Sequence, residues 1–289
     1  MEKTTIIKDF CVFIISHGRP DNVYTHSTIR KKGYNGPIFF VLDNEDKEYN
    51  KYVNNFPYDR VLIFDKNKIS KTTDNGDNFQ DLRTTTHARN ACFDFSKNLG
   101  YKYFLVLDDD YTDWSYRINQ NMEHPSGNYM IKENLNDVFQ NTLNYYKSAN
   151  FLSICFSQGG DLFGGKSNFN KAPKRKAMNS FFCSIDRPFK FFSRLNEDVN
   201  TYMALGSKGN LFLTIPAIQL NQKQTQATDG GMTETYLENG TYIKSFYTVM
   251  YCPSCTTITY MGRTNKRLHH HIKWKNAVPL IIEEKHKKL

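Results

Sequence analysis

Three consecutive aspartates, Asp108, Asp109 and Asp110, follow the apolar run YKYFLVL. Like charges repel one another and are costly to desolvate, so such a cluster beside a hydrophobic core requires a compensating cation or full exposure to solvent. In an extended segment alternate side chains face the same side, so Asp108 and Asp110 can bind one cation while Asp109 turns away. Carboxylate oxygens are ligands that suit Mg²⁺ and Mn²⁺. The cluster therefore indicates either a cation site or solvated carboxylates, and other residues must decide between them.

Two later groups could take part in the same chemistry. Glu197 and Asp198 open residues 194–210, which have the pattern of a short helix, and acidic residues there commonly act as caps and complement the helix macrodipole. The run LHHHIKW contains three adjacent histidines, of which His269 and His271 would share one side of an extended segment. We take His271 as the first candidate for a metal or phosphate contact, with a surface histidine as the alternative.

Apolar runs alternate with amphipathic segments through the first 110 residues. The runs are 10–16, 37–42, 60–64 and 103–107, and the segment 84–100 has the pattern of a helix that ends at Asn98-Leu99-Gly100. Strands and helices in alternation predict a parallel sheet with helices on both faces. We therefore predict an α/β fold with a Rossmann-like, mostly parallel central sheet flanked by helices.

Polar residues follow each of the four predicted strands, and in such a fold ligands bind outside these carboxyl ends. Besides the aspartates they include Ser16, His17, Arg19, Asp43 and Asp65. His17 and Arg19 could contact a nucleotide, or the sequence from Gly18 could be a turn that starts a helix. On the predicted helix before the fourth strand, Arg89 could simply form a salt bridge with the aspartates, and Asn90 lies beside it.

The second half is less regular, with predicted strands at 152–157, 179–185 and 211–220. Between the first two lies a loop, 158–177, rich in glycine and lysine. Its basic residues could contact phosphates, and Phe163 and Phe169 could stack on an exposed base; a disordered solvent loop is the alternative. The basic candidates are Lys171, Lys174, Arg175 and Lys176. The formal charge of +9 favours a polyanionic partner, above all nucleic acid, although solvated lysines explain any single run.

Composition limits the class of protein. A chain of 289 residues with 39% hydrophobic content can build one large core, and its apolar N-terminal run is too short for a signal peptide or a membrane span. We therefore expect no membrane association and a cytoplasmic protein. Six cysteines, mostly in apolar runs, predict buried thiols and not disulfides, and the CPSC motif at Cys252 and Cys255 is weak evidence for a metal site.

The ordered set of DDD after the fourth strand, the acidic pair opening a later helix and the late histidines resembles glycosyltransferases of the GT-A fold. This resemblance implies that Asp108–Asp110 is the DxD motif, whose outer positions hold Mn²⁺ or Mg²⁺ against a nucleotide-sugar diphosphate, and that a late histidine completes the metal site. It implies that Asn196-Glu197-Asp198 is the xED motif, with a carboxylate facing the acceptor. For an inverting enzyme we expect Asp198 to be the base, with Glu197 in reserve; a retaining enzyme has no such role.

A narrower resemblance comes from the segment before YFLVLDDD, from NEDVNTY and from HHHIKW. These are similar to bacteriophage glycosyltransferases that act on 5-hydroxymethylpyrimidines in DNA, such as 5-hydroxymethylcytosine, and are named for their association with TET-type oxygenases. The resemblance implies a nucleotide-sugar donor, UDP-linked, a DNA acceptor and, for a phage protein, the host cytoplasm. It implies one GT-A-like domain over 1–289, with a nucleotide-sugar-binding half at 8–115 and an acceptor-binding half with a basic tail at 150–289.

The donor contacts implied by this resemblance are Ser16, His17, Arg19, Asp43, Arg89, Asn90 and Asp109. Two other functions stay open at this point. A glycosyltransferase of the same fold could act on a polysaccharide, a protein or a small molecule. A module that kept the fold without catalysis would bind DNA whether or not metal and nucleotide are present.

Overall fold

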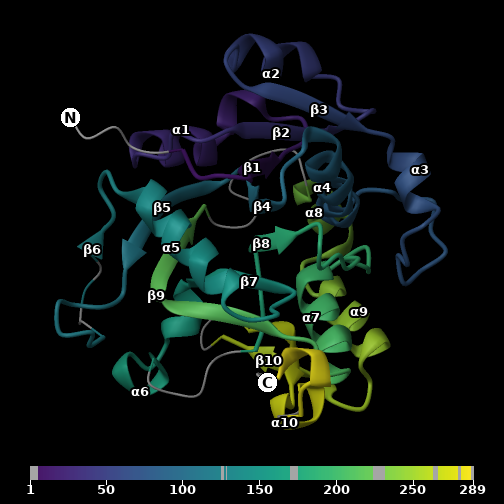
Figure 1. Cartoon of the computed structure of the whole chain (residues 1–289). Coiled ribbons are helices and arrows are strands. Elements are labelled where there is room, and N and C mark those ends of the chain that lie inside the picture. Colours follow the sequence, from purple (N-terminus) through teal and green to yellow (C-terminus); the bar gives the residue numbers. More distant parts are fainter. Residues whose placement is uncertain are drawn as a thin grey trace.

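A large mixed sheet runs through the structure, with helices packed against both of its faces (Figure 1). The computed structural model describes residues 6–124, 127, 129–169, 175–223, 232–262, 266–278 and 281–287. Among these residues nine strands form the sheet, in the order β3-β2-β1-β4-β8-β7-β9-β5-β6. They are β1 (Phe10–Ile15), β2 (Ile38–Asp43), β3 (Arg60–Phe64), β4 (Tyr103–Asp108), β5 (Tyr111–Tyr116), β6 (Tyr129–Met130), β7 (Ser153–Gln158), β8 (Ser180–Ser184) and β9 (Phe212–Gln222). A separate antiparallel hairpin pairs β10 (Thr256–Met261) with β11 (Arg267–Ile272).

Helices form most of the connections between the strands. They are α1 (Tyr24–Lys31), α2 (Tyr49–Asn55), α3 (Lys66–Ser70), α4 (Thr85–Leu99), α5 (Leu135–Lys147), α6 (Lys166–Phe169), α7 (Glu197–Ser207), α8 (Thr233–Asn239), α9 (Ile243–Tyr251) and α10 (Trp274–Ala277), with 3-10 turns at Pro20–Asn22, Gly159–Leu162 and Glu284–His286. Ile29 of α1 and Phe139 of α5 belong to one buried apolar cluster, whereas Ala91 of α4 and Val199 of α7 belong to another on the opposite side. The predicted α/β fold with a Rossmann-like sheet flanked by helices is confirmed.

The first four strands of the chain form a parallel block. β1 pairs in parallel with β2 on one side and with β4 on the other, and β2 pairs in parallel with β3. Every residue of β1 and β2 is buried, as expected for strands covered on both faces. Beyond β4 the sheet becomes mixed, because β8 runs antiparallel to both β4 and β7. The parallel pairing therefore holds for β1 to β4 and between β7 and β9, while β5 pairs antiparallel with β6 and β9.

The helix predicted over 84–100 forms because its ends carry strong signals. The Thr84 side chain accepts a hydrogen bond from the Thr86 backbone N–H at 3.1 Å, and Gly100 ends the helix in the left-handed conformation at φ 80°. This helix, α4, returns the chain to the start of β4 and so places the aspartates at the far end of that strand.

Two parts of the prediction differ from the structure. The sequence predicts a loop over 158–177, but Gly159–Leu162 and Lys166–Phe169 form short helices. The assumption that Asp108–Asp110 is extended is wrong, because β4 ends at Asp108 and the next two aspartates form a turn before β5 begins. All six cysteines are free thiols, as predicted. Over the residues that the structure describes, no helix is long and apolar enough to cross a membrane.

Candidate active site

The turn that carries the aspartates is fixed by one buried threonine of α1. Thr25 Oγ1 donates to the Asp108 carbonyl at 2.6 Å and accepts from the Tyr111 N–H at 2.9 Å, and the Thr25 N–H donates to the Asp109 carbonyl at 3.1 Å. On the other side, Asp108 is in register with Ile15 of β1. The backbone of the turn is thus satisfied on both sides, which leaves the three carboxylates to face the end of the sheet.

A cavity of about 220 Å³ opens at the carboxyl ends of β1, β2 and β4. This is the point in an open α/β sheet where the strand order reverses and where ligands bind. Several residues predicted from the sequence line it together: Ser16, His17, Arg19, Asp43, Asp108, Asp109 and Asp110. The end of β3 and the starts of α4 and α8 complete the wall.

Asp109 is the most buried of the three aspartates, with 1% of its surface exposed. Its Oδ2 accepts from Arg19 Nε at 2.8 Å and from the Ser16 hydroxyl. Ser16 is bonded in turn to the Tyr52 hydroxyl of α2 at 2.7 Å, which also accepts from the Arg19 N–H at 3.1 Å. Burial raises the pKa of Asp109, and the Arg19 charge and the Ser16 hydrogen bond oppose that rise. These contacts hold the loop after β1 against the aspartate turn.

Asp108 is joined to α7 through Arg89. The Arg89 guanidinium, 2% exposed, donates from Nη2 to Asp108 Oδ1 and from Nε to Glu197 Oε1, each at 3.0 Å. It also lies over the Phe181 ring, 4.7 Å from the centroid, and Glu197 Oε1 accepts from Thr85 Oγ1 at 2.5 Å. The predicted salt bridge of Arg89 with the aspartates is present, and it extends to the second acidic pair.

Asp110 is the carboxylate best suited to a cation. Burial, followed by the charges of Asp108 and Asp109, raises its pKa to about 7. Asp110 Oδ1 and Asp109 Oδ1 are both buried without a hydrogen-bond partner. A divalent cation would satisfy both oxygens, whereas Asp108 Oδ1 is already bonded to Arg89. In the described part of the chain, no group of three or more His, Cys, Asp or Glu side chains has the geometry of a metal site.

A second polar cluster lies at the end of β2. His17 Nδ1 is 2.8 Å from Asp43 Oδ2, and Lys66 Nζ is 3.2 Å from Asp43 Oδ1 and 3.0 Å from Glu45 Oε2. Burial opposes ionisation of Asp43, but the His17 hydrogen bond and the charges of His17 and Lys66 prevail and lower its pKa to about 2. The hydrogen bond to Asp43 raises the pKa of His17. This end of the cavity therefore offers a ligand an ionised carboxylate, the Lys66 ammonium and an imidazole whose protonation Asp43 favours.

Asp198 stands at the start of α7, 8% exposed, and burial followed by the Glu197 charge raises its pKa to about 6. Of the histidines, His270 lies next to this helix, with Nδ1 3.3 Å from Asn196 Nδ2. Burial lowers the pKa of His270 to about 3, with the charges of His269 and Lys244 adding to the effect. His271 is exposed on β11 and is not among the residues that line the cavity.

Asn90, Arg175 and Lys176 also lie outside the cavity lining. Asn90 makes two hydrogen bonds to the backbone of Phe191, from Nδ2 at 2.9 Å and to Oδ1 at 2.8 Å, so it fixes the chain before α7. Lys176 forms an ion pair with Asp161 at 2.5 Å. Arg175 is partly buried, while Lys171 and Lys174 fall outside the described residues.

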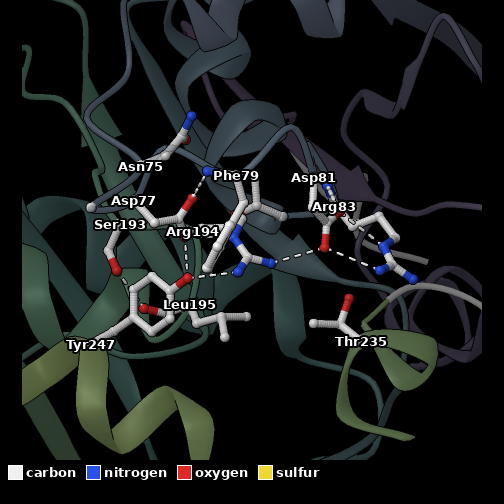
Figure 2. Close-up of polar contacts among 12 residues, drawn as sticks. Asn75, Asp77, Phe79, Asp81, Arg83, Ser193, Arg194, Leu195, Thr235 and Tyr247 are labelled. Carbon is white, nitrogen blue, oxygen red and sulfur yellow. Dashed lines mark hydrogen bonds and ion pairs between the residues drawn. The ribbon is translucent and has the colours of Figure 1, made fainter. Parts of the chain in front are cut away.

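A polar network borders the cavity on the side of α4 (Figure 2). The buried Arg194 donates from Nε to Asp77 and from Nη1 to Asp81, at 2.9 Å each. Its Nη2 donates to the Tyr247 hydroxyl of α9 at 2.6 Å. On the other side of Asp81, Arg83 donates to both carboxylate oxygens, at 2.9 and 3.1 Å. Since Arg83 lines the cavity, this network attaches the loop between α3 and α4 to the cavity wall.

Sequence reasoning missed several residues of this site. Lys66 directly follows Asp65, whose side chain caps α3 by accepting from the Lys68 N–H at 2.9 Å, and this capping pattern was a usable signal. Thr25, Tyr52 and Tyr236 had no signal of their own, because their roles depend on how separate elements pack together.

The fold and the family comparison together define a glycosyltransferase. A family model described as TET-Associated Glycosyltransferase matches residues 10–231, which include β1, the aspartate turn and the acidic pair of α7. The chain belongs to this family, as its resemblance to that group predicted. A search of curated proteins returned no match.

Proposed function

We propose that this glycosyltransferase moves a sugar from a UDP-linked nucleotide-sugar to a hydroxymethylated pyrimidine base in DNA, with Mn²⁺ or Mg²⁺ bound at the aspartate turn. The observation that carries the proposal is the cavity in which Asp108, Asp109 and Asp110 meet the ends of β1 and β2. Buried carboxylates with unpartnered oxygens fit a cation, and a cation there would offset the charge of a diphosphate leaving group.

In this proposal, different residues of the cavity bind different parts of the donor. His17, Asp43 and Lys66 bind the nucleoside end, because they place a carboxylate and cations beside the first two parallel strands. Asp109 and Asp110 would hold the cation, and Arg19, ion-paired with Asp109, lies where it can reach a phosphate oxygen. The nucleotide therefore lies across the switch point of the sheet, with its sugar toward α7.

Asp198 takes the acceptor proton in an inverting transfer. The acceptor oxygen forms a bond to the anomeric carbon as the bond from that carbon to the diphosphate oxygen breaks, and the hydroxyl proton passes to the Asp198 carboxylate. Burial and Glu197 raise the pKa of Asp198 to about 6, which suits a base that works near neutral pH. Glu197 is less suited, because its Oε1 is already bonded to Arg89 and Thr85.

The acceptor is DNA in this proposal, supported by the formal charge of +9 and by the family. A base would have to leave the duplex stack to reach the cavity, as for other enzymes that act on bases. The test is to incubate the protein with DNA containing 5-hydroxymethylcytosine, Mn²⁺ or Mg²⁺ and a panel of UDP-glucose, UDP-galactose and GDP-mannose. Mass spectrometry of the digested DNA should show one hexose added per modified base, with unmodified DNA as the control. Hydrolysis of a donor without transfer to this DNA would instead indicate a polysaccharide, protein or small-molecule acceptor.

A further inference from the structure

α8 forms the wall of the cavity that faces the aspartate turn. Tyr236 lines the cavity from the middle of this helix, while the next residue, Leu237, is 72% exposed on the outer side. An aromatic ring with a hydroxyl group offers both an apolar face and a hydrogen-bonding tip to a ligand. Tyr236 is therefore placed to contact whatever molecule lies over the aspartates.

The position of Tyr236 along the cavity is set by its neighbours. Tyr236 and Thr85 line the same cavity, and Thr85 Oγ1 donates to Glu197 Oε1 at 2.5 Å, so this wall borders the acidic pair of α7. Burial raises the pKa of the Tyr236 phenol, and the charges of Glu197 and Asp198 add to the effect. Asp43 lies two strands from Asp108 in the sheet, a separation of about 10 Å at the usual strand spacing. Tyr236 thus stands at the α7 end of the cavity, away from the cluster around Asp43.

Ion pairs from Arg83 to two glutamates, Glu234 and Glu238, hold α8 in this position. Arg83 donates from Nη1 to Glu238 Oε1 at 2.9 Å and from Nη2 to Glu238 Oε2 at 2.6 Å, and it is 3.8 Å from Glu234 Oε2 one turn earlier. The same guanidinium holds Asp81, which is bonded to the buried Arg194 (Figure 2). The chain of contacts from Arg194 to Glu238 attaches α8 to the network at the base of α4.

We infer that Tyr236 contacts the transferred sugar of the donor, and that the Arg83–Glu238 ion pair is the positioning contact that holds it there. The inference rests on the proposed function, because it takes the nucleoside to lie at the Asp43 end of the cavity. A donor that lies in that direction has its sugar between the aspartate turn and the acidic pair of α7, in the part of the cavity that Tyr236 lines.

The experiment compares the affinity for a nucleotide-sugar with the affinity for the free nucleotide. Isothermal titration with the UDP-hexose identified as donor, and with UDP alone, should be run on the Tyr236→Ala variant. We expect the Kd for the UDP-hexose to rise about tenfold, equivalent to 1.4 kcal/mol, while the Kd for UDP changes less than about twofold. Tyr236→Phe keeps the ring and should cause a smaller loss, of about the size of one hydrogen bond. Leu237→Ala is the matched control on the exposed side and should change neither Kd.

The positioning contact is tested with two glutamines. Glu238→Gln removes the bidentate ion pair and should raise the Kd for the UDP-hexose in the same direction as Tyr236→Ala, whereas Glu234→Gln removes only the 3.8 Å contact and should have less effect. An equal loss of UDP and UDP-hexose binding in Tyr236→Ala, or no loss of either, would overturn the assignment. Wild-type protein that binds neither ligand would instead overturn the proposed donor, and the sugar contact with it.

Discussion

Arg89 and Glu197 lie 108 positions apart in the chain and form a buried ion pair, with 3.0 Å between Nε and Oε1. The other end of the same guanidinium binds Asp108, so one side chain holds the carboxylate at the end of β4 at a fixed place relative to the first turn of α7. The guanidinium of Arg89 stays protonated and lies between the carboxylates of Asp108 and Glu197, so it offsets the repulsion between them. This single side chain couples the aspartate turn to the acidic pair of α7.

Replacing Arg89 with methionine should destabilise the protein strongly. Removing one partner of a buried ion pair leaves the other charges uncompensated, at a cost of about 3–5 kcal/mol in the free energy of unfolding. Arg89→Lys is the matched variant: its ammonium keeps the charge but lacks the planar fork that reaches both carboxylates, so it should fall between methionine and the parent. Urea unfolding at constant pH measures both. A methionine variant as stable as the parent would show that the pair does not act as described.

Asp110 and Asp108 should differ in how their substitution affects stability. Asp110→Asn removes a buried carboxylate that has an unpartnered oxygen and two charged neighbours, so the variant should be at least as stable as the parent. Asp108→Asn removes a partner of Arg89 and should be less stable. Asp110→Asn should also abolish metal-dependent donor binding and transfer, because Asp110 is one of the two carboxylates proposed to hold the cation. Titration with Mn²⁺ and a transfer assay would measure these losses. Full activity in Asp110→Asn would exclude a metal site at this turn.

The pH dependence of turnover should reflect Asp198. Its pKa of about 6 means that the carboxylate able to accept a proton forms as the pH rises through 6, so kcat should rise over the same range. Asp198→Asn should lower kcat far more than it raises the donor Kd, because a base acts in the transition state. Equal losses of both would place Asp198 in the donor pocket instead.

The raised pKa of Asp198 also affects the stability of the protein, which should fall as the pH rises, whereas kcat should rise. A carboxyl group whose pKa is higher in the folded than in the unfolded state binds more protons when folded, so it stabilises the protein at low pH. This contribution is complete below the unfolded value of about 4 and is lost as the pH rises through about 6. Asp198→Asn should remove that part of the pH dependence in urea unfolding between pH 4 and 8.

The basic loop should govern DNA affinity independently of sequence. A lysine or arginine that neutralises a phosphate releases condensed counterions, so each such residue removed should flatten the slope of log affinity against log salt by roughly 0.9 on duplex DNA. Changing Lys171, Lys174 and Arg175 to Ala should weaken DNA binding and leave donor hydrolysis unaffected. Lys176→Ala should have less effect on DNA, because Lys176 is paired with Asp161. A triple variant with the parent's affinity and salt slope would show that this loop does not bind DNA.

The parallel half of the fold was predictable because its signals are local. β1 and β2 are continuous apolar runs buried on both faces, and α4 has a capping threonine and a terminal glycine. The aspartate turn and the polar residues after β1 and β2 could be placed at one edge because parallel strands end together. Their meeting in one cavity follows from topology alone.

The parts of the site that could not be predicted depend on packing between distant segments. Nothing in the sequence distinguishes Arg83 from other surface residues of a loop, or Tyr236 from other surface residues of a short helix. Strand alternation shows that His269 and His271 share one side of the strand, but it does not show which side faces the rest of the protein. In the structure, His270 is the histidine that lies next to α7, and His271 is exposed. The turn at Asp109 was missed because the threonine that satisfies its backbone lies more than eighty residues earlier.

The strand order has a consequence for the order in which the site can form during synthesis. β4 ends in the aspartates, yet one of its edges is covered only by β8, and Asp108 gains its link through Arg89 to Glu197 only when α7 is made. A nascent chain that has emerged as far as β5 therefore carries the complete parallel block, with β4 as an uncovered apolar edge. The acidic pair of α7 can join the aspartate turn only after just over two-thirds of the polypeptide has been made, and until β8 is made the edge of β4 is open to pairing with other chains.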